Sequence, residues 1–413
     1  MKHRLRALER ELRVAEGFFA LAILGWGLSS DTLALFGCLG VLAFIALDLW
    51  QRYSLAGLSY RRRLERPRAS FGERVGLEVE ISNDKPLPLS YVEIADEVPE
   101  GLAIDGGEVT KSFGRKATLV QVLPLLPYQR VRRRLVIHCD RRGEHRIGPA
   151  RLTSGDPIGY RRRVEDLHES EHLLVYPKLL ALQPAGIASR LLLGETRRQV
   201  ELVTDPSRVA GVRAYEPGDP LRHIDWRATA RAGDLLVRRF EPTLSQRVAV
   251  FLDVRVPQFT SWTPAPDELE FAVALTASLI AALAQAQVPV GLFTTGSAGG
   301  HPPAHTPSRT PQGLVGMLES LARLVPHGPL FISEILESVC ATMARQTSVV
   351  VVAGDFPLST LSAMAHVRRR HSLSALHLAS GMGSPPPRDQ VDALLQTRYV
   401  DDWHDRTALE LSA

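Results

Sequence analysis

Two long apolar segments near the N-terminus constrain this chain more than any other feature. Residues 12–28 and 32–50 carry few charges, and only Ser29, Ser30 and Asp31 separate them. Each run approaches the roughly 20 residues that cross a bilayer as a helix. Trp26 and Trp50 lie near the ends of the runs, where interfacial aromatic residues are common. The pattern predicts a transmembrane helical hairpin over residues 1–57, with spans at about 12–28 and 32–50.

Positive charge flanks both apolar runs on the same side. Residues 1–13 contain five basic and two acidic residues, and residues 50–68 contain six basic and one acidic. The positive-inside rule then places the N-terminus and the main body in the cytoplasm, with the protein in the inner (plasma) membrane. A cleaved signal peptide, a buried soluble hairpin and an interfacial hairpin are the alternatives. No cleavage-site pattern follows the first run, and the second run begins at once.

Composition removes other classes of protein. The 413 residues include 49 basic and 45 acidic ones, a net charge of +4, and outside the flanks the chain is nearly neutral. Nucleic-acid binding needs a basic face, so we expect no nucleic-acid partner. Cys38, Cys139 and Cys340 are too widely spaced for a CxxC motif, which argues against a disulfide framework or thiolate zinc site. The oligomeric state is not indicated.

Residues 58–165 alternate between apolar and polar positions with the period of a β-strand. Val75, Leu77, Val79 and Ile81 form one such run, and 91–95, 119–125, 130–138, 144–147 and 151–153 give others. Turn residues separate them. This pattern predicts an antiparallel, immunoglobulin-like β-sandwich.

The densest polar segment, residues 213–241, lies in a connector predicted at 166–245. Its residue pattern resembles the signature of the domain-of-unknown-function 58 family, and the resemblance includes the N-terminal hairpin and the turns at 142–149 and 156–159. The residues that carry it are Arg213, Tyr215, Gly218, Asp219, Arg222, His223, Asp225, Trp226, Arg231, Arg238 and Glu241.

Three roles are open for this segment. Alternating arginines and aspartates in a Pro/Gly-rich turn favour a latch of ion pairs and hydrogen bonds between domains. The same residues could form a partner-binding surface. Asp219, His223 and Asp225 could also make an acid–base or metal site, since H-x-D pairs occur in metal centres. No nucleophile with an adjacent base is evident, so no catalytic residue is assigned.

Residues 246–413 alternate strands with helices. Strands are expected at 248–252, 288–293, 349–353 and 373–378, and helices at 267–286, 312–324, 331–344 and 358–370. Continuously apolar strands between helices predict a mostly parallel sheet covered on both faces. The Pro/His-rich stretch after Gly300 is predicted to be a mobile loop.

This region resembles a von Willebrand factor A domain. In that family a metal sits above the sheet, and the resemblance places Asp253 and Asp355 on two ligand positions, with Thr310 offered as a third. Arg255 and Pro257 stand where ligand serines belong, and a positive charge opposes a bound cation. The site is therefore predicted to be degenerate, with Mg²⁺ the only cofactor to consider.

The sequence favours a non-enzymatic, membrane-anchored interaction or scaffold protein. The resemblance implies cooperation with a MoxR-type AAA+ ATPase in the assembly or activation of protein complexes. The alternative is a metal-dependent, hydrolase-like enzyme that uses Asp219, His223 and Asp225.

Overall fold

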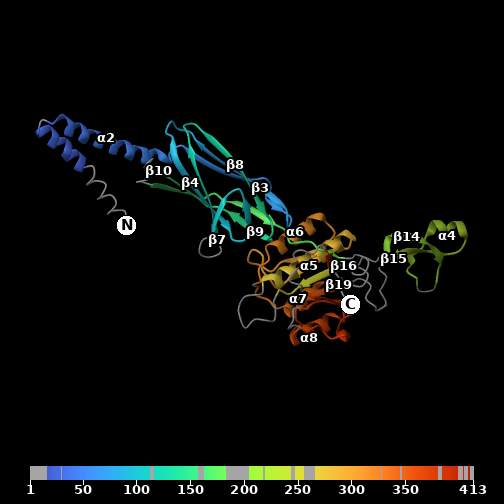
Figure 1. Cartoon of the computed structure of the whole chain (residues 1–413). Coiled ribbons are helices and arrows are strands. Elements are labelled where there is room, and N and C mark those ends of the chain that lie inside the picture. Colours follow the sequence, from blue (N-terminus) through green and yellow to red (C-terminus); the bar gives the residue numbers. More distant parts are fainter. Residues whose placement is uncertain are drawn as a thin grey trace. The chain divides into compact units, whose positions relative to one another are not determined.

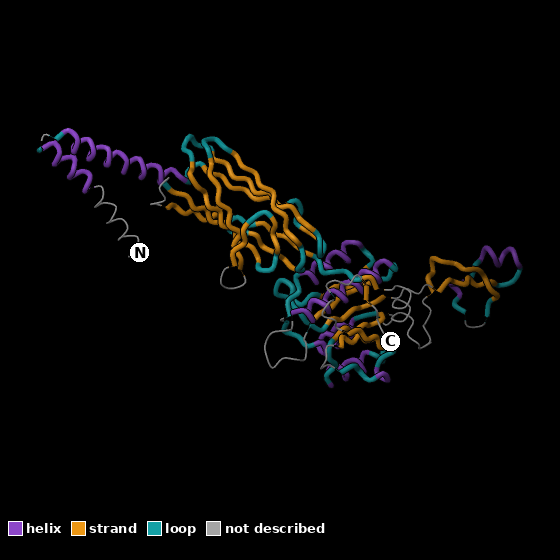
Figure 2. The backbone as a smooth tube through the Cα atoms, in the orientation of Figure 1, coloured by secondary structure: helices purple, strands orange, loops and turns teal. Residues whose placement is uncertain are grey.

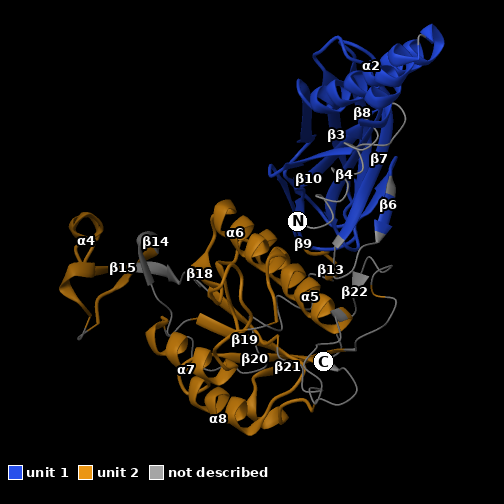
Figure 3. Cartoon of the chain, turned by 90° about the vertical axis from the view of Figure 1, so that its left-hand side faces the viewer, with its two compact units in different colours: residues 1–176 blue, residues 177–413 orange. Residues whose placement is uncertain are grey.

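The computed structural model divides the chain into two compact units, residues Met1–Tyr176 (unit 1) and Pro177–Ala413 (unit 2) (Figure 3). The structure describes residues 16–28, 30–111, 116–156, 162–182, 204–216, 219–242, 247–254, 266–326, 328–344, 347–379, 384–398, 403 and 408–409. Two helices near the N-terminus precede many antiparallel strands, and a mixed, largely parallel sheet follows (Figure 1).

The N-terminal helices are Glu16–Gly27 and α2 (Asp31–Ser54). Within the described residues, α2 is the one helix long and apolar enough to cross a membrane. Only 6% of its most apolar window is buried inside the chain, unlike the core helix of a soluble protein. The predicted second span, 32–50, falls inside α2. The first extends to residues 12–15, which lie outside the described residues, and the part described is shorter than a full span.

The two N-terminal helices pack closely through glycines. A Cβ added at Gly25 would overlap the backbone of Ala34, and one at Gly37 would overlap that of Ala22. An added Cβ at Gly40 would overlap the ring of Phe18. Small residues let helix backbones approach each other in this way. The described helices therefore pack against each other as a tight hairpin.

Unit 1 contains two larger antiparallel sheets and a smaller mixed one. Their strand orders are β1-β3-β8-β5, β11-β10-β4-β7-β6 and β2-β12-β9. The strands are β1 (Leu58–Leu64), β2 (Arg68–Ala69), β3 (Arg74–Asn83), β4 (Leu89–Pro99), β5 (Ala103–Asp105), β6 (Glu108–Lys111), β7 (Lys116–Leu125), β8 (Arg130–His138), β9 (Gly143–Ile147), β10 (Ala150–Gly155), β11 (Arg162–Leu167) and β12 (Glu171–Val175). The strands predicted between residues 75 and 153 are confirmed. Unit 1 continues past residue 165 because β12 pairs with β9 and β2.

The core of unit 1 follows from strand alternation. Val75, Leu77, Val79 and Ile81 of β3 are buried, while the polar residues between them are less covered. Burying such a side chain contributes about 1.5–3 kcal/mol relative to leaving it exposed. The same alternation on β4 and β8 closes one continuous apolar cluster.

A buried ion pair lies beside this core. Arg62 Nη1 is 2.5 Å from Asp96 Oδ1, and the Tyr60 hydroxyl donates to Asp96 Oδ2. Burial and the neighbouring carboxylate raise the pKa of Tyr60, so the hydroxyl keeps its proton. Arg62 belongs to the basic flank counted above, yet its side chain is almost fully buried. It therefore contributes to the fold of unit 1 and is not a charge available to a membrane surface.

Unit 2 contains a six-stranded sheet of order β18-β17-β16-β19-β20-β21. Its neighbours pair in parallel except for β18, which is antiparallel to β17. The strands are β16 (Arg247–Leu252), β17 (Val290–Thr294), β18 (Ala304–Ser308), β19 (Thr347–Ala353), β20 (Leu373–Ala379) and β21 (Ala393–Arg398). The helices are α5 (Pro266–Gln285), α6 (Pro311–Ala322), α7 (Ile332–Thr342) and α8 (Leu358–Val367), with the short helix η2 (Arg388–Gln390). The expected mostly parallel sheet is confirmed.

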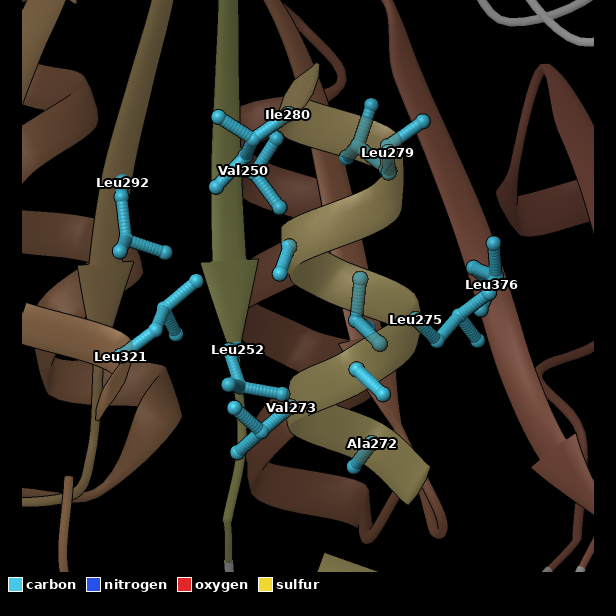
Figure 4. Close-up of a cluster of buried hydrophobic side chains, with 14 of the residues drawn as sticks. Val250, Leu252, Ala272, Val273, Leu275, Leu279, Ile280, Leu292, Leu321 and Leu376 are labelled. Carbon is cyan, nitrogen blue, oxygen red and sulfur yellow. The ribbon is translucent and has the colours of Figure 1, made fainter. Parts of the chain in front are cut away.

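Both faces of this sheet are covered, as its continuous apolar strands require. Val250 and Leu252 of β16 face a cluster with α5 and α6 (Figure 4), while Ala249 and Phe251 face a second cluster with α7 and α8. The stretch predicted to be a mobile loop instead contains β18. Pro307 is tolerated there because β18 is an edge strand.

Two further sheets complete unit 2. Strands β13 (Ala181–Leu182) and β22 (Ala408–Leu409) pair in parallel. Strands β14 (Thr204–Ala214) and β15 (Leu236–Pro242) form an antiparallel hairpin. Between these last two lie the 3₁₀ turn η1 (Leu221–His223) and the helix α4 (Trp226–Ala232).

Candidate functional site

The described residues among those that carry the sequence resemblance fold into one small substructure, which we call the signature lobe (residues 204–242). Its hairpin pairs Val212 with Arg238 and Arg213 with Val237. Ile224, after η1, bridges to Val237 from the other side, and both side chains are buried. Among the side chains of the lobe that the structure describes, these two form the apolar centre, and polar contacts add to its order. Figure 2 shows the hairpin with its short helical segments.

Arg213 and Asp219 make a two-pronged ion pair within the lobe. Arg213 Nη1 donates to Asp219 Oδ2 at 2.7 Å, and Nη2 donates to Oδ1 at 2.6 Å. The backbone N–H of Glu216 adds a bond to Oδ2 at 2.9 Å. The hydrogen bond from Arg213, followed by that from Glu216, holds the pKa of Asp219 below its ordinary value. This arrangement ties the turn before η1 to strand β14.

Asp225 is the N-cap of α4. Its Oδ1 accepts from the N–H groups of Arg227 and Ala228, both at 3.1 Å, which is the usual role of an Asp at this position. Its Oδ2 accepts from Arg238 Nε at 3.1 Å. The Ala228 N–H and the Arg238 guanidinium lower the pKa of Asp225. A single carboxylate therefore joins the start of α4 to β15.

The other predicted residues of the signature occupy different surroundings. The Tyr215 N–H donates to Leu235 O at 2.9 Å, and Arg222 Nε donates to His223 Nε2 at 3.3 Å. Trp226 is 66% exposed, and Arg231 is also exposed. Glu241 lies on β15, but its side chain is outside the part described. Gly218 lies outside the described residues.

Large apolar side chains of the lobe face solvent next to basic ones. Leu221 is 69% exposed, and Trp226 is exposed to a similar extent. Arg222, Arg227 and Arg231 are exposed close to them in the chain. Tryptophan and arginine are the residue types most enriched at energetically important positions of protein interfaces. The lobe thus combines a polar framework built on Asp219 and Asp225 with an exposed apolar and cationic surface.

The second predicted site lies at the carboxyl ends of the central strands of unit 2. Thr295 Oγ1 donates to Asp253 Oδ1 at 2.8 Å and accepts from the Val254 N–H at 3.0 Å. Asp355 follows β19, the strand beside β16, and its Oδ1 accepts from Ser384 N at 3.3 Å. Both aspartates are thus at the sheet edge where ligands of parallel sheets bind.

Thr295 lies at this end of the sheet, and the sequence analysis did not predict it as a site residue. Thr310, offered from the sequence, instead caps α6, where its hydroxyl accepts from Gly313 N at 3.1 Å. The register between β16 and β17 brings Thr294 beside Leu252, so the next residues of both strands meet. The sequence does not show this pairing, because it depends on how the strands of the sheet align. The one sequence feature that could have indicated Thr295 is its position directly after a buried strand.

The residues at these two sites do not fit a resident metal as they stand. In the described ranges, no three His, Cys, Asp or Glu side chains form a group that could hold a metal ion. Asp219 and Asp225 are engaged by guanidinium groups, and Asp253 is engaged by Thr295.

Known proteins similar to this chain are themselves of unknown function. A family model described as protein of unknown function DUF58 matches residues 211–389, from the signature lobe through most of the six-stranded sheet. The uncharacterized protein YeaD of Bacillus subtilis (strain 168) is 26% identical over 259 residues, which are 59% of this chain. The aligned part spans 57% of that relative's length.

Among solved structures, a cohesin module of a Clostridium perfringens family 33 glycoside hydrolase aligns with a TM-score of 0.21 and 10% identity, covering 29% of this chain and 96% of that one. The alkylpurine DNA glycosylase AlkC of Pseudomonas fluorescens aligns with a TM-score of 0.19 and 18% identity, covering 37% of this chain and 40% of that one. Scores this low assign neither a fold nor a function.

Proposed function

We propose that this chain is a membrane-anchored interaction protein that docks a partner through the signature lobe. The proposal rests on the different roles of two sets of side chains in the lobe. Asp219 and Asp225 are used to hold the backbone in place, while Leu221 and Trp226 remain in solvent. An ordered surface with exposed Trp and Arg side chains suits recognition, whereas aspartates already paired with arginines are poorly placed for catalysis.

The anchor is a transmembrane hairpin made of Glu16–Gly27 and α2. The glycine contacts support this, since helices in lipid associate through close packing of small residues. The outer surface of the hairpin also supports it, because Trp26, Phe36 and Leu42 are largely exposed and need an apolar solvent. The basic flanks then orient both ends, and with them the two units, toward the cytoplasm.

The two units have finer identities in this proposal. Unit 1 is an immunoglobulin-like sandwich, supported by its antiparallel sheets around one core. The sheet of unit 2 is a von Willebrand A-like domain, supported by Asp253 and Asp355 at the ends of adjacent strands. Asp253 and Thr295 are buried and bonded to each other at this edge, and Mg²⁺ there needs donors beyond those that the structure describes.

The partner proposed is a MoxR-type AAA+ ATPase, for assembly or activation of protein complexes. The choice of this class of partner comes from the family resemblance. The exposed side chains of the lobe indicate what kind of surface the partner must have. A surface with Leu221, Trp226 and exposed arginines calls for an acidic face with an apolar pocket. Complementary charge mainly speeds encounter and sets orientation, while the buried aromatic residue supplies affinity.

The metal-dependent hydrolase that uses Asp219, His223 and Asp225 is the competing proposal. Placing a cation there would require breaking the fork from Arg213 or the bond from Arg238. The guanidinium charges would also repel the metal. No observation in the described residues favours this reading over the interaction surface.

Affinity capture of the full-length protein from membranes tests the proposal. We expect a AAA+ ATPase of the MoxR type to be recovered, with recovery that changes when Mg²⁺ and ATP are removed. Recovery without any AAA+ ATPase under all conditions would contradict it. Hydrolytic activity that depends on added metal and disappears in the Asp219→Asn protein would favour the competing proposal.

A further inference from the structure

The C-terminal end of α2 is fixed inside unit 1 by three contacts. Lys85 Nζ donates to Ser54 O at 2.8 Å, and Arg163 Nη1 donates to Arg52 O. Leu55, the next residue of the chain, is buried in the core of unit 1. Cationic donors suit the free carbonyls at a helix C-terminus. Helix α2 therefore enters unit 1 as a clamped element and has no free hinge at this end.

The turn at residues 126–128, which joins β7 to β8, lies at the same end of unit 1. Tyr128 N donates to Lys85 O at 3.3 Å, and the side chain of Lys85 reaches α2. The buried Asn83 side chain donates to Leu126 O and Leu87 O, both at 2.9 Å. One hydrogen-bonded set thus connects the end of α2, the 84–88 turn and the 126–128 turn. The turns beside the end of α2 are visible in Figure 2.

This turn holds two large apolar side chains in solvent. Leu126 is 64% exposed and Tyr128 is 70% exposed. Tyr128 also has a φ of 56°, a left-handed conformation that is uncommon for a residue other than glycine. Gln129 stabilises the turn, since its Oε1 accepts from Leu126 N at 2.7 Å. The fold of unit 1 therefore maintains an unfavourable backbone conformation that displays side chains its own core does not use.

The length of α2 sets the level of this turn relative to a bilayer. Its 24 residues extend about 36 Å at 1.5 Å per residue, longer than a hydrocarbon core of about 30 Å. If the helix crosses the bilayer, its last turn, with Arg52 and Tyr53, reaches the headgroup level. The 84–88 turn is hydrogen-bonded to that last turn through the Lys85 side chain, and the 126–128 turn is hydrogen-bonded to the Lys85 backbone, so both turns lie close to the same level. Tyrosine favours this interface, and the exposed Arg162 and Arg163 of β11 can meet lipid phosphates.

We propose that the 126–128 turn is a second membrane contact of this protein, with Leu126 and Tyr128 inserted at the boundary between headgroups and acyl chains. The occupant of this surface is the bilayer that α2 crosses, so the inference rests on the proposed anchoring. Unit 1 then contacts the membrane surface in a fixed orientation and does not rotate freely about the end of α2. Arg163 and Lys85 hold it there through α2.

Depth-dependent quenching in proteoliposomes tests the inference with the full-length chain. A fluorophore is attached at Leu126→Cys or at Tyr128→Cys, each in a Cys38→Ser background, since Cys139 and Cys340 are buried. Ser70→Cys is the matched control, because Ser70 is an exposed turn residue beyond the opposite end of β3. The native Cys38, exposed on α2, reports on the helix. Quenchers are phosphatidylcholine spin-labelled at the headgroup or on the acyl chain, and aqueous iodide.

We expect the labels at 126 and 128 to be quenched several-fold more by shallow spin-labelled lipid than the label at 70, and to be protected from iodide. If they behave like the label at 70 while the label at Cys38 is quenched by acyl-chain spin labels, the anchoring stands and the inference is wrong. If the label at Cys38 is quenched by iodide and not by lipid, the proposed anchoring fails and the inference fails with it. Membrane insertion caused by unfolding of the variants is excluded when Leu126→Cys and Tyr128→Cys both retain the wild-type hydrogen exchange of β7 and β8.

Discussion

Arg238 Nε donates to Asp225 Oδ2 at 3.1 Å, and this bond joins the last strand of the signature lobe to the first turn of α4. Asp225 meanwhile caps the helix through its other oxygen. The position of Trp226, the next residue, therefore depends on a carboxylate that has two structural duties. A partner surface centred on Trp226 is therefore ordered only while Asp225 keeps its bonds to α4 and to Arg238.

Removing the carboxylate should release α4 from the lobe. In the Asp225→Ala protein, Arg227 and Ala228 lose their acceptor and Arg238 loses its ion pair. We expect faster hydrogen exchange at the amides of α4 and at Leu236, with no change in the six-stranded sheet. Asp225→Asn is the control, since asparagine also caps helices, and it should recover the protection at 227 and 228. Unchanged exchange in the alanine variant would mean that the junction does not order the lobe.

Acidification should loosen the lobe in the same way. Hydrogen bonds hold the pKa values of Asp219 and Asp225 below those of the unfolded chain, near 3.9 for aspartate. A lowered folded-state pKa gives stability that is complete above the unfolded value and is lost as the pH falls through the folded one. We expect lobe exchange, corrected for intrinsic rate, to be constant from pH 7 to 5 and to rise below about pH 4. An onset at pH 6 would point to a different group.

Unit 1 should lose stability at mildly acidic pH through His145. Burial lowers the pKa of this side chain, whose Nε2 lies 2.9 Å from Arg141 O. The unfolded chain binds a proton near pH 6.5 and the folded one only at lower pH, so stability falls as the pH drops below about 6.5. Thermal unfolding of unit 1 at pH 7.5 and 5.5 checks this. A His145→Gln protein should show a smaller difference between the two pH values than the wild type.

Breaking the buried ion pair of unit 1 should be costly. Arg62→Met leaves Asp96 buried with only the Tyr60 hydroxyl, and loss of one partner of a buried pair costs about 3–5 kcal/mol. Native-state hydrogen exchange of β1, β3 and β8 reports this free energy. Arg61→Met, on the same strand but exposed, should stay within about 0.5 kcal/mol of the wild type. Equal effects of the two substitutions would refute a special role for Arg62.

Packing of the N-terminal hairpin should depend on Gly37. A Val at this position would overlap the backbone of Ala22, whereas Gly27 has open space where a side chain would begin. With spin labels at Leu24→Cys and Leu35→Cys in a Cys38→Ser background, Gly37→Val should lengthen and broaden the measured distance distribution. Gly27→Val should leave it unchanged. A distribution insensitive to Gly37→Val would mean that the two helices do not pack as described.

The sequence predicts the parallel sheet well because β16 and β19 are buried on both faces and carry nothing but apolar residues in their centres. It does not predict β18, since the alternation there is weak and the pairing comes from β17 across the turn. Strand β15 carries Arg238 in the middle of its pairing with β14, so its pattern resembles a solvated loop. The role of Arg62 is hidden as well, because Asp96 is 34 residues away in sequence.

The alternation of Arg and Asp in residues 213–238 predicts ion pairs, and Arg213–Asp219 and Arg238–Asp225 are found. Every bond that the structure gives to these two aspartates stays inside the lobe, where they brace one substructure, and the latch between domains stays a prediction. Which residues pair depends on the register of β14 and β15, and that register is set by the tertiary fold.

Binding of the purified full-length protein to the captured ATPase tests the central claim most directly. Trp226→Ser should weaken the complex at least about tenfold, a loss of about 1.4 kcal/mol, which is more than most interface residues contribute. Leu358→Ser, which removes an 85% exposed leucine from α8, should bind like the wild type. Hydrogen exchange of the lobe must be the same in both variants. Wild-type affinity of the Trp226→Ser protein, with its lobe intact, would contradict the account.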